Sequence, residues 1–367
     1  MKILFFINKI GGGGRERRMS QLVHAFDKIE GIEMMAVVSS DQVDYKDIFS
    51  TKINVKVVDN SSPLQRLKMY CAIVKDYRPN IIHLWIETSM YCILLPILSK
   101  LYKSKMIAGF VADANTLDSR SLFSRMAIRF SFLFSDIIIS NSVAGLKAKK
   151  TPLRKSVVIY NGFDRNRLPC KINVGSKKGQ LGIKEDFLVT MCGRVTSAKD
   201  WDMFVALAEK VNSKRNDVFF LAVGDGDNLE YFRDVIIKKQ LNNIRFVGRR
   251  SDIEEILAAS AVSVLFTNNE KHAEGVSNSI MESMAVGVPV IATQGGGTAE
   301  IITSGYDGYI IEPHNVQNAY NRLIELLDDV RKRMVFGSNS QKTIEERFAL
   351  DDMGKKYLEV YNNLLNK

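Results

Sequence analysis

Apolar runs and amphipathic stretches alternate along the first 160 residues. Residues 2–8 (KILFFIN) form an apolar run that ends at glycines, which predicts a buried strand. The stretch from Met19 to Ile29 then repeats apolar residues at helical spacing. Further runs of both kinds follow with short connections. Alternating strands and helices predict a parallel sheet covered by helices on both faces.

The pattern breaks near residue 161, where a stretch rich in glycine and lysine runs to about residue 186. Strand–helix alternation then restarts and continues to residue 329. We therefore expect two doubly wound domains, at residues 1–164 and 165–345. An amphipathic helix within 346–367 ends the chain, and its apolar face could pack outside its own domain.

Length and composition agree with two soluble domains. A chain of 367 residues is too long for one ordinary core, and 46% hydrophobic with 25% charged residues is typical of globular proteins. The N-terminal run lacks the cleavage site of a signal peptide, and no apolar stretch reaches membrane-spanning length. Four scattered cysteines suit a reducing compartment, so we expect a cytoplasmic protein.

The net charge of +10 favours an anionic partner. Nucleic acid, an anionic membrane and phosphorylated substrates all satisfy that condition. The basic residues have no accompanying aromatic platform, which disfavours nucleic acid.

Three glycine-bearing stretches lie where ligands bind in such sheets, after a strand and before a helix. INKIGGGGRERR allows close approach of the backbone, but it matches neither a dinucleotide fingerprint nor a P-loop, and a flexible turn explains it equally well. In CGRVTSAKDW, Arg194 and Lys199 could bind phosphate, although solvated loop charges are the simpler interpretation of that segment alone. For LAVGDGDN a simple turn is favoured.

The stretch EGVSNSIMES carries two carboxylates, Glu274 and Glu282. Ser277 or Asn278 can cap the helix that starts there, so amides at its beginning are available to an anion. Amides and cations would bind charge while carboxylates bind hydroxyls, which suits a polyol attached to phosphate. An ordinary capped helix with acidic residues near its N-terminus remains the alternative.

The order of these stretches, together with FVGRRSDI and GGTAEII, resembles the retaining GT-B glycosyltransferases of family 4, the glycosyl transferases group 1. The resemblance covers nearly the whole chain, and the two glutamates eight residues apart are its most specific part. It implies two Rossmann-like domains facing across a cleft, with the last helix crossing back to the first domain. It also implies hexosyl transfer from a UDP- or GDP-sugar to a glycan or lipid-linked acceptor in polysaccharide biosynthesis.

The resemblance assigns roles by position. Glu274 would hold donor-sugar hydroxyls and Glu282 the ribose, while Arg194 and Lys199 would neutralise the diphosphate. The catalytic candidates are Glu274, Asp113, Arg194 and Lys199. The donor-binding candidates are Gly12, Gly13, Arg194, Lys199, Gly248, Arg249, Glu274, Gly275, Val276, Ser277 and Glu282.

One position departs from the family pattern. Such enzymes often carry a histidine before the aspartate, whereas this chain has Ala112 before Asp113. His83 and His272 are better explained as structural. The four histidines have no metal-ligand spacing, so neither a metal nor a cofactor is expected. Ala112 keeps open a non-catalytic subunit that binds a nucleotide-sugar or polysaccharide, and a GT-B nucleotide-sugar epimerase is a second alternative.

A basic, apolar segment in the first domain makes an anionic membrane surface a further candidate partner. Residues 120–134 place three arginines among aromatic and aliphatic residues, and residues 145–155 add five basic ones. Basic residues near anionic lipid contribute about 1 kcal/mol each. We therefore expect peripheral association with the inner face of the membrane. In the alternative interpretation the helix packs on the sheet and Lys147, Lys149 and Lys150 are only solvated.

Overall fold

The chain forms two compact units. The computed structural model describes residues 1–11, 13–40, 51–58, 62–118, 120–169 and 173–366. The first unit comprises Met1–Gly162 with Leu350–Lys367, and the second comprises Phe163–Ala349. The sequence placed these divisions at 164/165 and 345/346, a few residues away in each case.

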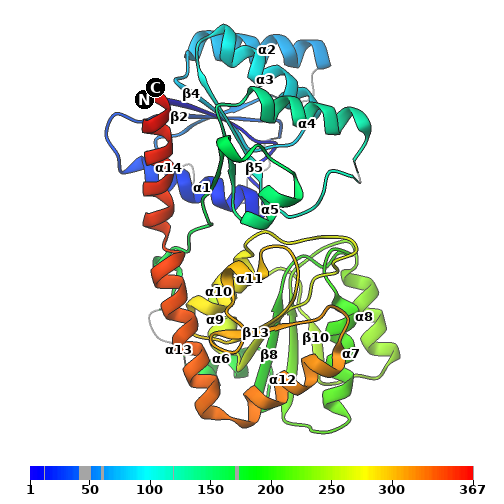
Figure 1. Ribbon diagram of the computed structural model, residues 1–367. Coiled ribbons are helices and arrows are strands. Elements are labelled where there is room, and N and C mark those ends of the chain that lie inside the picture. The colour runs from blue at the N-terminus through cyan, green and yellow to red at the C-terminus, as the bar shows by residue number, and fades with distance from the viewer. Residues whose placement is uncertain (12, 41–50, 59–61, 119, 170–172, 367) are drawn as a thin grey trace. The chain divides into compact units, whose positions relative to one another are not determined.

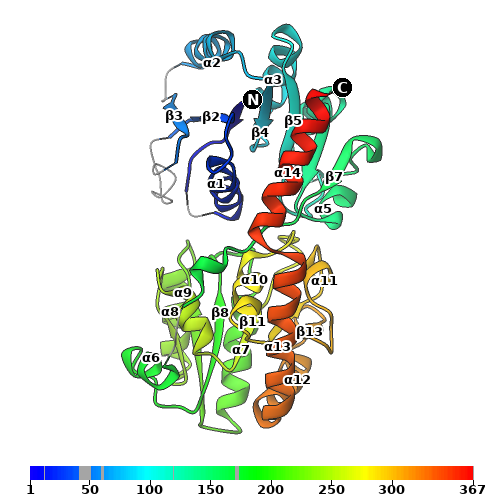
Figure 2. The same ribbon diagram turned by 90° about the vertical axis from the view of Figure 1, so that its left-hand side faces the viewer.

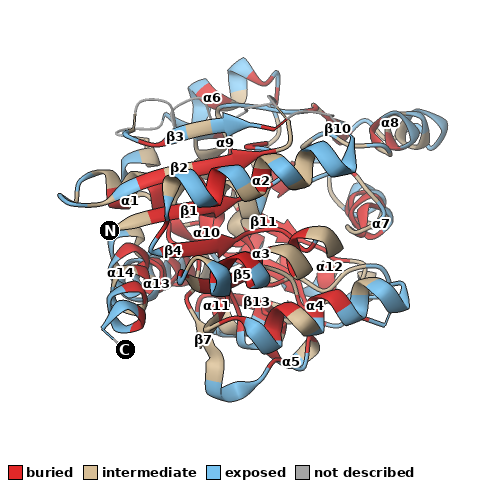
Figure 3. Cartoon of the chain, turned by 90° about the horizontal axis from the view of Figure 1, so that it is seen from above, coloured by how far each residue is buried: buried red, intermediate tan, exposed pale blue. Residues whose placement is uncertain are grey.

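The first unit is built on a parallel sheet of seven strands in the order β3-β2-β1-β4-β5-β6-β7 (Figure 1). Its strands are β1 (Lys2–Phe6), β2 (Glu33–Val38), β3 (Asn54–Val57), β4 (Ile81–Leu84), β5 (Lys105–Val111), β6 (Ile137–Ser140) and β7 (Ser156–Val158). The central strands are almost wholly buried (Figure 3), because helices cover both of their faces. The chain order reverses between β1 and β4, where ligands of open parallel sheets bind.

Helices cover the two faces of this sheet separately. They are α1 (Gly14–Asp27), α2 (Pro63–Tyr77), α3 (Ser89–Leu101), α4 (Leu122–Phe134), α5 (Val143–Ala148) and α14 (Leu350–Leu365). One buried cluster joins the sheet to α2, α3 and α4. A second cluster joins it to α1 and α14. Helix α2 begins with a capping box formed by Ser62 and Gln65, which satisfies two backbone amides at its first turn.

The last helix of the chain completes the core of the first unit. Figures 1 and 2 show α14, in red, beside α1. Arg18 of α1 is fully buried, and its guanidinium lies 5.3 Å from the ring centroid of Trp85 and 5.4 Å from that of Tyr357. Nδ1 of His83 lies 2.5 Å from the hydroxyl of Tyr361. Burial, and then the charge of Arg18, lowers the pKa of His83, so this histidine is a neutral core residue, as the sequence indicated.

The second unit has a parallel sheet of six strands in the order β10-β9-β8-β11-β12-β13. Its strands are β8 (Phe187–Cys192), β9 (Val218–Val223), β10 (Ile244–Phe246), β11 (Val262–Leu265), β12 (Val290–Thr293) and β13 (Gly308–Ile311). The order again reverses once, between β8 and β11. The carboxyl ends of these two strands therefore flank the expected ligand position.

Helices also surround the second sheet. They are α6 (Val174–Gln180), α7 (Trp201–Asn212), α8 (Leu229–Lys238), α9 (Ile253–Ala258), α10 (Asn278–Ala285), α11 (Thr298–Ile301), α12 (Val316–Asp328) and α13 (Val330–Arg347). Helix α13 was not predicted, and its solvent-facing side carries two exposed apolar residues, Met334 and Val335, that blur the helical pattern. The polar stretch that the sequence presented as a linker holds α6 and a short 3-10 helix, Arg165–Arg167.

Within the described residues, no helix has the length and apolar character needed to cross a membrane. In the same part of the chain, no group of three or more His, Cys, Asp and Glu side chains could hold a metal ion. Cys71, Cys92 and Cys192 are free thiols.

Candidate functional site

The site in the second unit lies where β8 and β11 end. Arg194 follows β8 with an exposed side chain, and Lys199 lies at the entry to α7. The backbone of this loop is fixed to the end of β11, because Asp200 N donates to Phe266 O at 3.0 Å and Asn268 N donates to Ala198 O at 3.1 Å. The two loops therefore form one surface at the reversal of strand order.

Lys199 and Glu274 form an ion pair at this surface. The ammonium of Lys199 donates to Oε1 of Glu274, and both side chains are largely buried, with 11% and 17% of their surface exposed. His272 Nε2 lies 3.6 Å from the same carboxylate oxygen. The sequence gave Lys199 and Glu274 separate tasks, phosphate and sugar, but the structure brings them into direct contact. A ligand that used both would have to part them.

A glycine turn after β12 positions the backbone of Glu274. Gly297 N donates to the carbonyl oxygen of Glu274 at 2.8 Å. Gly296 has a φ of +52°, and a Cβ added there would lie 1.9 Å from that same oxygen. A residue with a side chain at position 296 would therefore displace the Glu274 loop or change its own backbone.

The loops after β8, β9 and β10 join the same surface through their backbones. Gly224 has a φ of +148°, and a Cβ added to it would meet the carbonyl oxygen of Gly193 at 1.8 Å. Gly224 N donates to Gly248 O at 2.9 Å, and Arg249 follows with an exposed side chain. The turn at 224–226, which the sequence presented as a simple turn, thus holds the Arg194 loop and the Gly248 loop together.

Helix α10 begins beside β8. The N-cap position is Ser277, as expected, but its hydroxyl makes no capping hydrogen bond. Ser279 Oγ instead donates to the carbonyl oxygen of Cys192 at 2.8 Å, which fastens the helix start to the end of β8. The backbone of Gly275, Val276 and Ser277 is buried at this approach.

Glu282 lies in the second turn of α10 and is almost fully buried. Its Oε1 accepts a hydrogen bond from Nη2 of Arg167 at 2.9 Å, and the same guanidinium nitrogen also bonds Glu254. The sequence missed Arg167, because a partner 115 residues away in a polar stretch leaves no local pattern. The carboxylate expected to bind ribose is thus already paired with a cation from the beginning of the second unit.

The candidates of the first unit lie at the carboxyl edge of its own sheet. Asp113 follows β5, and Gly13 holds the N-cap position of α1. Gly12 lies outside the described residues. Ala112 occupies the place of the family's histidine, and its carbonyl oxygen accepts from Asn141 Nδ2 at 3.3 Å.

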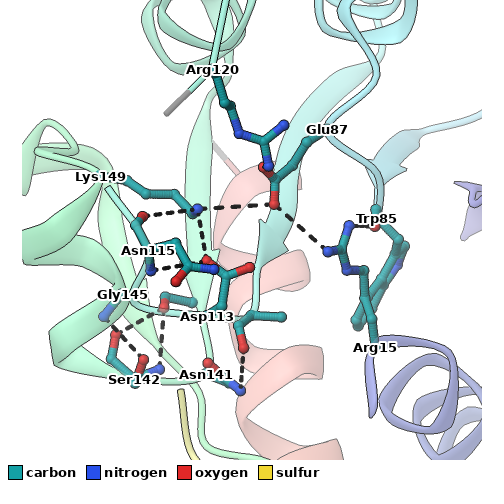
Figure 4. A network of polar contacts seen from close by, with 12 residues as sticks. Arg15, Trp85, Glu87, Asp113, Asn115, Arg120, Asn141, Ser142, Gly145 and Lys149 are labelled. Atoms are coloured by element: carbon teal, nitrogen blue, oxygen red, sulfur yellow. Dashed lines mark hydrogen bonds and ion pairs between the residues drawn. The ribbon is translucent and has the colours of Figure 1, made fainter. Parts of the chain in front are cut away.

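A buried lysine is the partner of Asp113 (Figure 4). Only 1% of the Lys149 side chain is exposed, and its Nζ lies 3.0 Å from Asp113 Oδ1 and 3.9 Å from Glu87 Oε1. The interpretation of Lys149 as a solvated surface lysine was therefore wrong. Burial alone would raise the pKa of Asp113, but Lys149, with a further contribution from Arg15, holds it below its usual value.

The three arginines of residues 120–134 also have partners. Arg120 bonds Oε2 of Glu87, Arg125 lies 3.6 Å from Asp118, and Arg129 donates to the carbonyl oxygens of Lys149 and Lys150, both at 2.8 Å. Around them, Leu122, Phe123, Met126 and Leu133 of α4 are exposed. This helix thus buries one face on the sheet and leaves another apolar face in solvent.

Replacing Gly296 with alanine tests how Glu274 is positioned. We expect Gly296→Ala to lower the free energy of unfolding by clearly more than the about 1–2 kcal/mol of left-handed backbone strain, because the new Cβ meets a carbonyl oxygen. Gly305→Ala is the matched control, since its φ is +83° but its Cβ would enter open space. Urea denaturation and hydrogen exchange of residues 266–277 measure the effect. Equal costs for the two variants would contradict it.

Replacing Lys149 with methionine tests the buried ion pair. We expect the free energy of unfolding to fall by about 3 kcal/mol at pH 7, as for other broken buried pairs. The native pKa of Asp113 lies below its usual value of about 4, so ionised Asp113 stabilises the wild type above that pH, and the benefit is lost as pH falls through the native pKa. The difference between the two proteins should therefore shrink on acidification.

Lys147→Met, at an exposed lysine two residues away, is the control for Lys149→Met and should change little. Denaturation curves between pH 7 and pH 3 provide the comparison. A difference that stays constant over this range would show that Asp113 does not depend on Lys149.

The comparisons with known proteins agree on fold and family. Residues 175–343 match the family described as Glycosyl transferases group 1. Anabaena HepE, solved in complex with UDP-glucose, superposes with a TM-score of 0.86 at 22% identity, covering 99% of this chain and 100% of that one. This likeness establishes the fold, which is the GT-B class of two Rossmann-like units.

Two curated relatives extend the comparison. The UDP-Gal:alpha-D-GlcNAc-diphosphoundecaprenol alpha-1,3-galactosyltransferase of Escherichia coli is 31% identical over 210 residues, 52% of each chain. An uncharacterized glycosyltransferase of Methanocaldococcus jannaschii is 23% identical over 96% of this chain and 95% of its own. The chain thus spans about half the length of the galactosyltransferase. Through residues 175–343, it belongs to the glycosyl transferases group 1 family.

Proposed function

We propose that the protein transfers a sugar from a nucleotide-sugar, a UDP- or GDP-sugar, to a glycan or lipid-linked acceptor with retention of anomeric configuration. The observation that carries the proposal is the pairing of Lys199 with Glu274 beside the exposed Arg194, at the reversal of strand order. It supplies cations for a diphosphate and a carboxylate for sugar hydroxyls in one place. The Escherichia coli relative is named for a UDP-sugar donor and a lipid diphosphate acceptor.

The chemistry assigned to this site requires stabilisation of negative charge. When the bond from the sugar to the phosphate breaks, positive charge develops on the sugar and negative charge on the departing diphosphate. Arg194, Lys199 and the amides that begin α10 would stabilise the diphosphate, the largest expected contribution to such a step. The acceptor hydroxyl would attack the face that the diphosphate leaves, and its proton would pass to a phosphate oxygen. Glu274 would orient the sugar hydroxyls.

Binding of nucleotide would rearrange two ion pairs. The ammonium of Lys199 would turn from Glu274 to the diphosphate, which would free the carboxylate for the sugar. Ribose hydroxyls would approach Glu282 while Arg167 keeps the charge of this buried carboxylate compensated. Gly248 and Arg249 would border the base. In the first unit, Asp113 with Lys149, and the glycines at 12 and 13, would serve the reacting end of the donor.

We extend the proposal to the surface where the protein works. Leu122, Met126 and Leu133 border a hollow of about 480 Å³ on the first unit, together with the basic residues Arg125 and Lys150. An exposed apolar helix face with cations beside it suits an anionic bilayer. The proposed occupant is the lipid surface that carries the acceptor, at the inner face of the membrane.

Affinity for a diphosphate tests the donor site. We expect UDP or GDP to raise the melting temperature of the full chain, and Arg194→Ala to weaken that nucleotide about tenfold or more while its nucleoside changes little, because the lost hydrogen bonds are to charged phosphates. Arg331→Ala, an exposed arginine on α13, is the control. Equal weakening of nucleotide and nucleoside would remove Arg194 from the diphosphate.

Release of free nucleotide on addition of a lipid-linked diphosphate sugar then tests transfer itself. Nucleotide binding without release for any acceptor would favour the binding subunit. A change of sugar configuration without an acceptor would favour the epimerase.

Membrane association is tested by sedimentation with vesicles. We expect binding to anionic vesicles at low salt that weakens at high salt. Met126→Ser should reduce it about tenfold, since burial of one such side chain contributes roughly 1.5–3 kcal/mol. Met334→Ser is the control, because that methionine is equally exposed but lies on α13. Binding that ignores salt, lipid charge and Met126 would contradict the proposal.

A further inference from the structure

A polar hollow of about 420 Å³ opens at the reversal of strand order in the first unit. Its lining comes from segments that follow β1 and β4, with one side from α4. The lining residues are Asn8, Arg15, Ile86, Glu87, Thr88, Ser89, Arg120 and Ser124. It lies on the opposite side of Arg120 in sequence from the apolar hollow of α4, and the two hollows have no lining residue in common.

Two arginines are held in this hollow by one buried carboxylate (Figure 4). Glu87 has 5% of its side chain exposed, whereas Arg15 and Arg120 have 28% and 37% exposed. Arg120 bonds Oε2 of Glu87, and Nη2 of Arg15 lies 3.7 Å from Oε1. Among the described residues, that Oε1 makes no hydrogen bond. The enclosed carboxylate therefore orients two guanidinium groups whose remaining N–H donors reach the hollow.

The linked charges leave the hollow positive. Arg15, Arg120 and Lys149 are three cations, while Glu87 and Asp113 are two carboxylates, so one positive charge remains in excess. Two guanidinium groups side by side suit the oxygens of a phosphate or carboxylate.

A helix start adds donors to the same hollow. Thr88 holds the N-cap position of the 13-residue helix α3, and its side chain makes no capping hydrogen bond. The amides of the first turn are therefore available, and they attract an anion together with the helix dipole.

Hydroxyl groups complete the lining. The hydroxyls of Ser89 and Ser124 lie 3.1 Å apart, and Asn8 contributes a side-chain amide. Hydroxyl and amide groups both donate and accept, so they match the hydroxyls of a sugar. The hollow thus combines a place for one anionic group with places for hydroxyls.

We propose that this hollow binds the acceptor of the transfer reaction, and that the acceptor is a polyol carrying an anionic phosphate, which Arg15, Arg120 and the start of α3 hold while Ser89 and Ser124 bind hydroxyls. This assignment of substrate class rests on the proposed function. Glu87 is a positioning residue, because it acts through the two arginines. The phosphate would fix the acceptor, and the hydroxyl that reacts would lie elsewhere on the same molecule.

Ligand-observed NMR titration of the full chain with α-D-glucose 1-phosphate tests the proposal. Saturating UDP is present so that the probe cannot occupy a diphosphate site. We expect glucose 1-phosphate to bind more tightly than either glucose or inorganic phosphate. Arg120→Ala should weaken it about tenfold or more, as for a lost charge-assisted hydrogen bond. Ser124→Ala should weaken glucose 1-phosphate but leave inorganic phosphate unchanged.

Arg125→Ala is the matched control, because Arg125 lies on the same helix and borders the other hollow. Equal responses to Arg120→Ala and Arg125→Ala would overturn the proposal, as would a probe that binds no better than glucose. Loss of the probe in Arg194→Ala alone would place it in the second unit and would also overturn it.

A failure of the proposed function gives a different result. Then no nucleotide binds and no sugar is transferred, whatever happens at Arg120. If transfer does occur, Arg120→Ala should raise KM for a phosphorylated acceptor while kcat changes less. An unchanged KM would separate the hollow from the acceptor and leave the transfer reaction intact.

Discussion

Lys149 has almost no contact with solvent, and an ammonium in such a position is stable only where carboxylates surround it. Asp113 and Glu87 meet this requirement, and each must in turn be oriented by its own neighbours. The end of β5, the segment after β4 and the last turn of α5 are thereby fixed to one another. The carboxyl edge of the first sheet is organised around this cation.

The second unit meets the same requirement in a way that favours exchange. Lys199 and Arg167 neutralise the two glutamates that are candidates for ligand binding, and all four side chains keep some access to solvent. A ligand with both negative charge and hydroxyl groups can replace each member of the Lys199–Glu274 pair without leaving a buried charge uncompensated. A neutral sugar or a bare phosphate could replace only one member. Specificity for a sugar joined to phosphate follows from this balance.

The sequence could predict what depends on local spacing. Periodicity identified both sheets, and helix α10 begins at the residue next to the expected cap, because its pattern and its flanking turns lie within one short stretch. The roles of Arg167 and Lys149 could not be predicted, since their partners lie 36 to 115 residues away and only folding brings them together. Helix α13 was missed because exposed methionine and valine hide its polar face. The resemblance supplied the glutamates, but not the cations that neutralise them.

Helix α14 makes the first unit discontinuous, and this has a consequence during synthesis. As the polypeptide leaves the ribosome, residues 1–162 appear first, with the apolar face that receives Tyr357 and Tyr361 uncovered. That face stays open while the whole second unit is translated, and it closes only after the stop codon has been reached. The nascent chain therefore holds an incomplete core for almost the full time of translation, a state in which chaperones bind and aggregation begins.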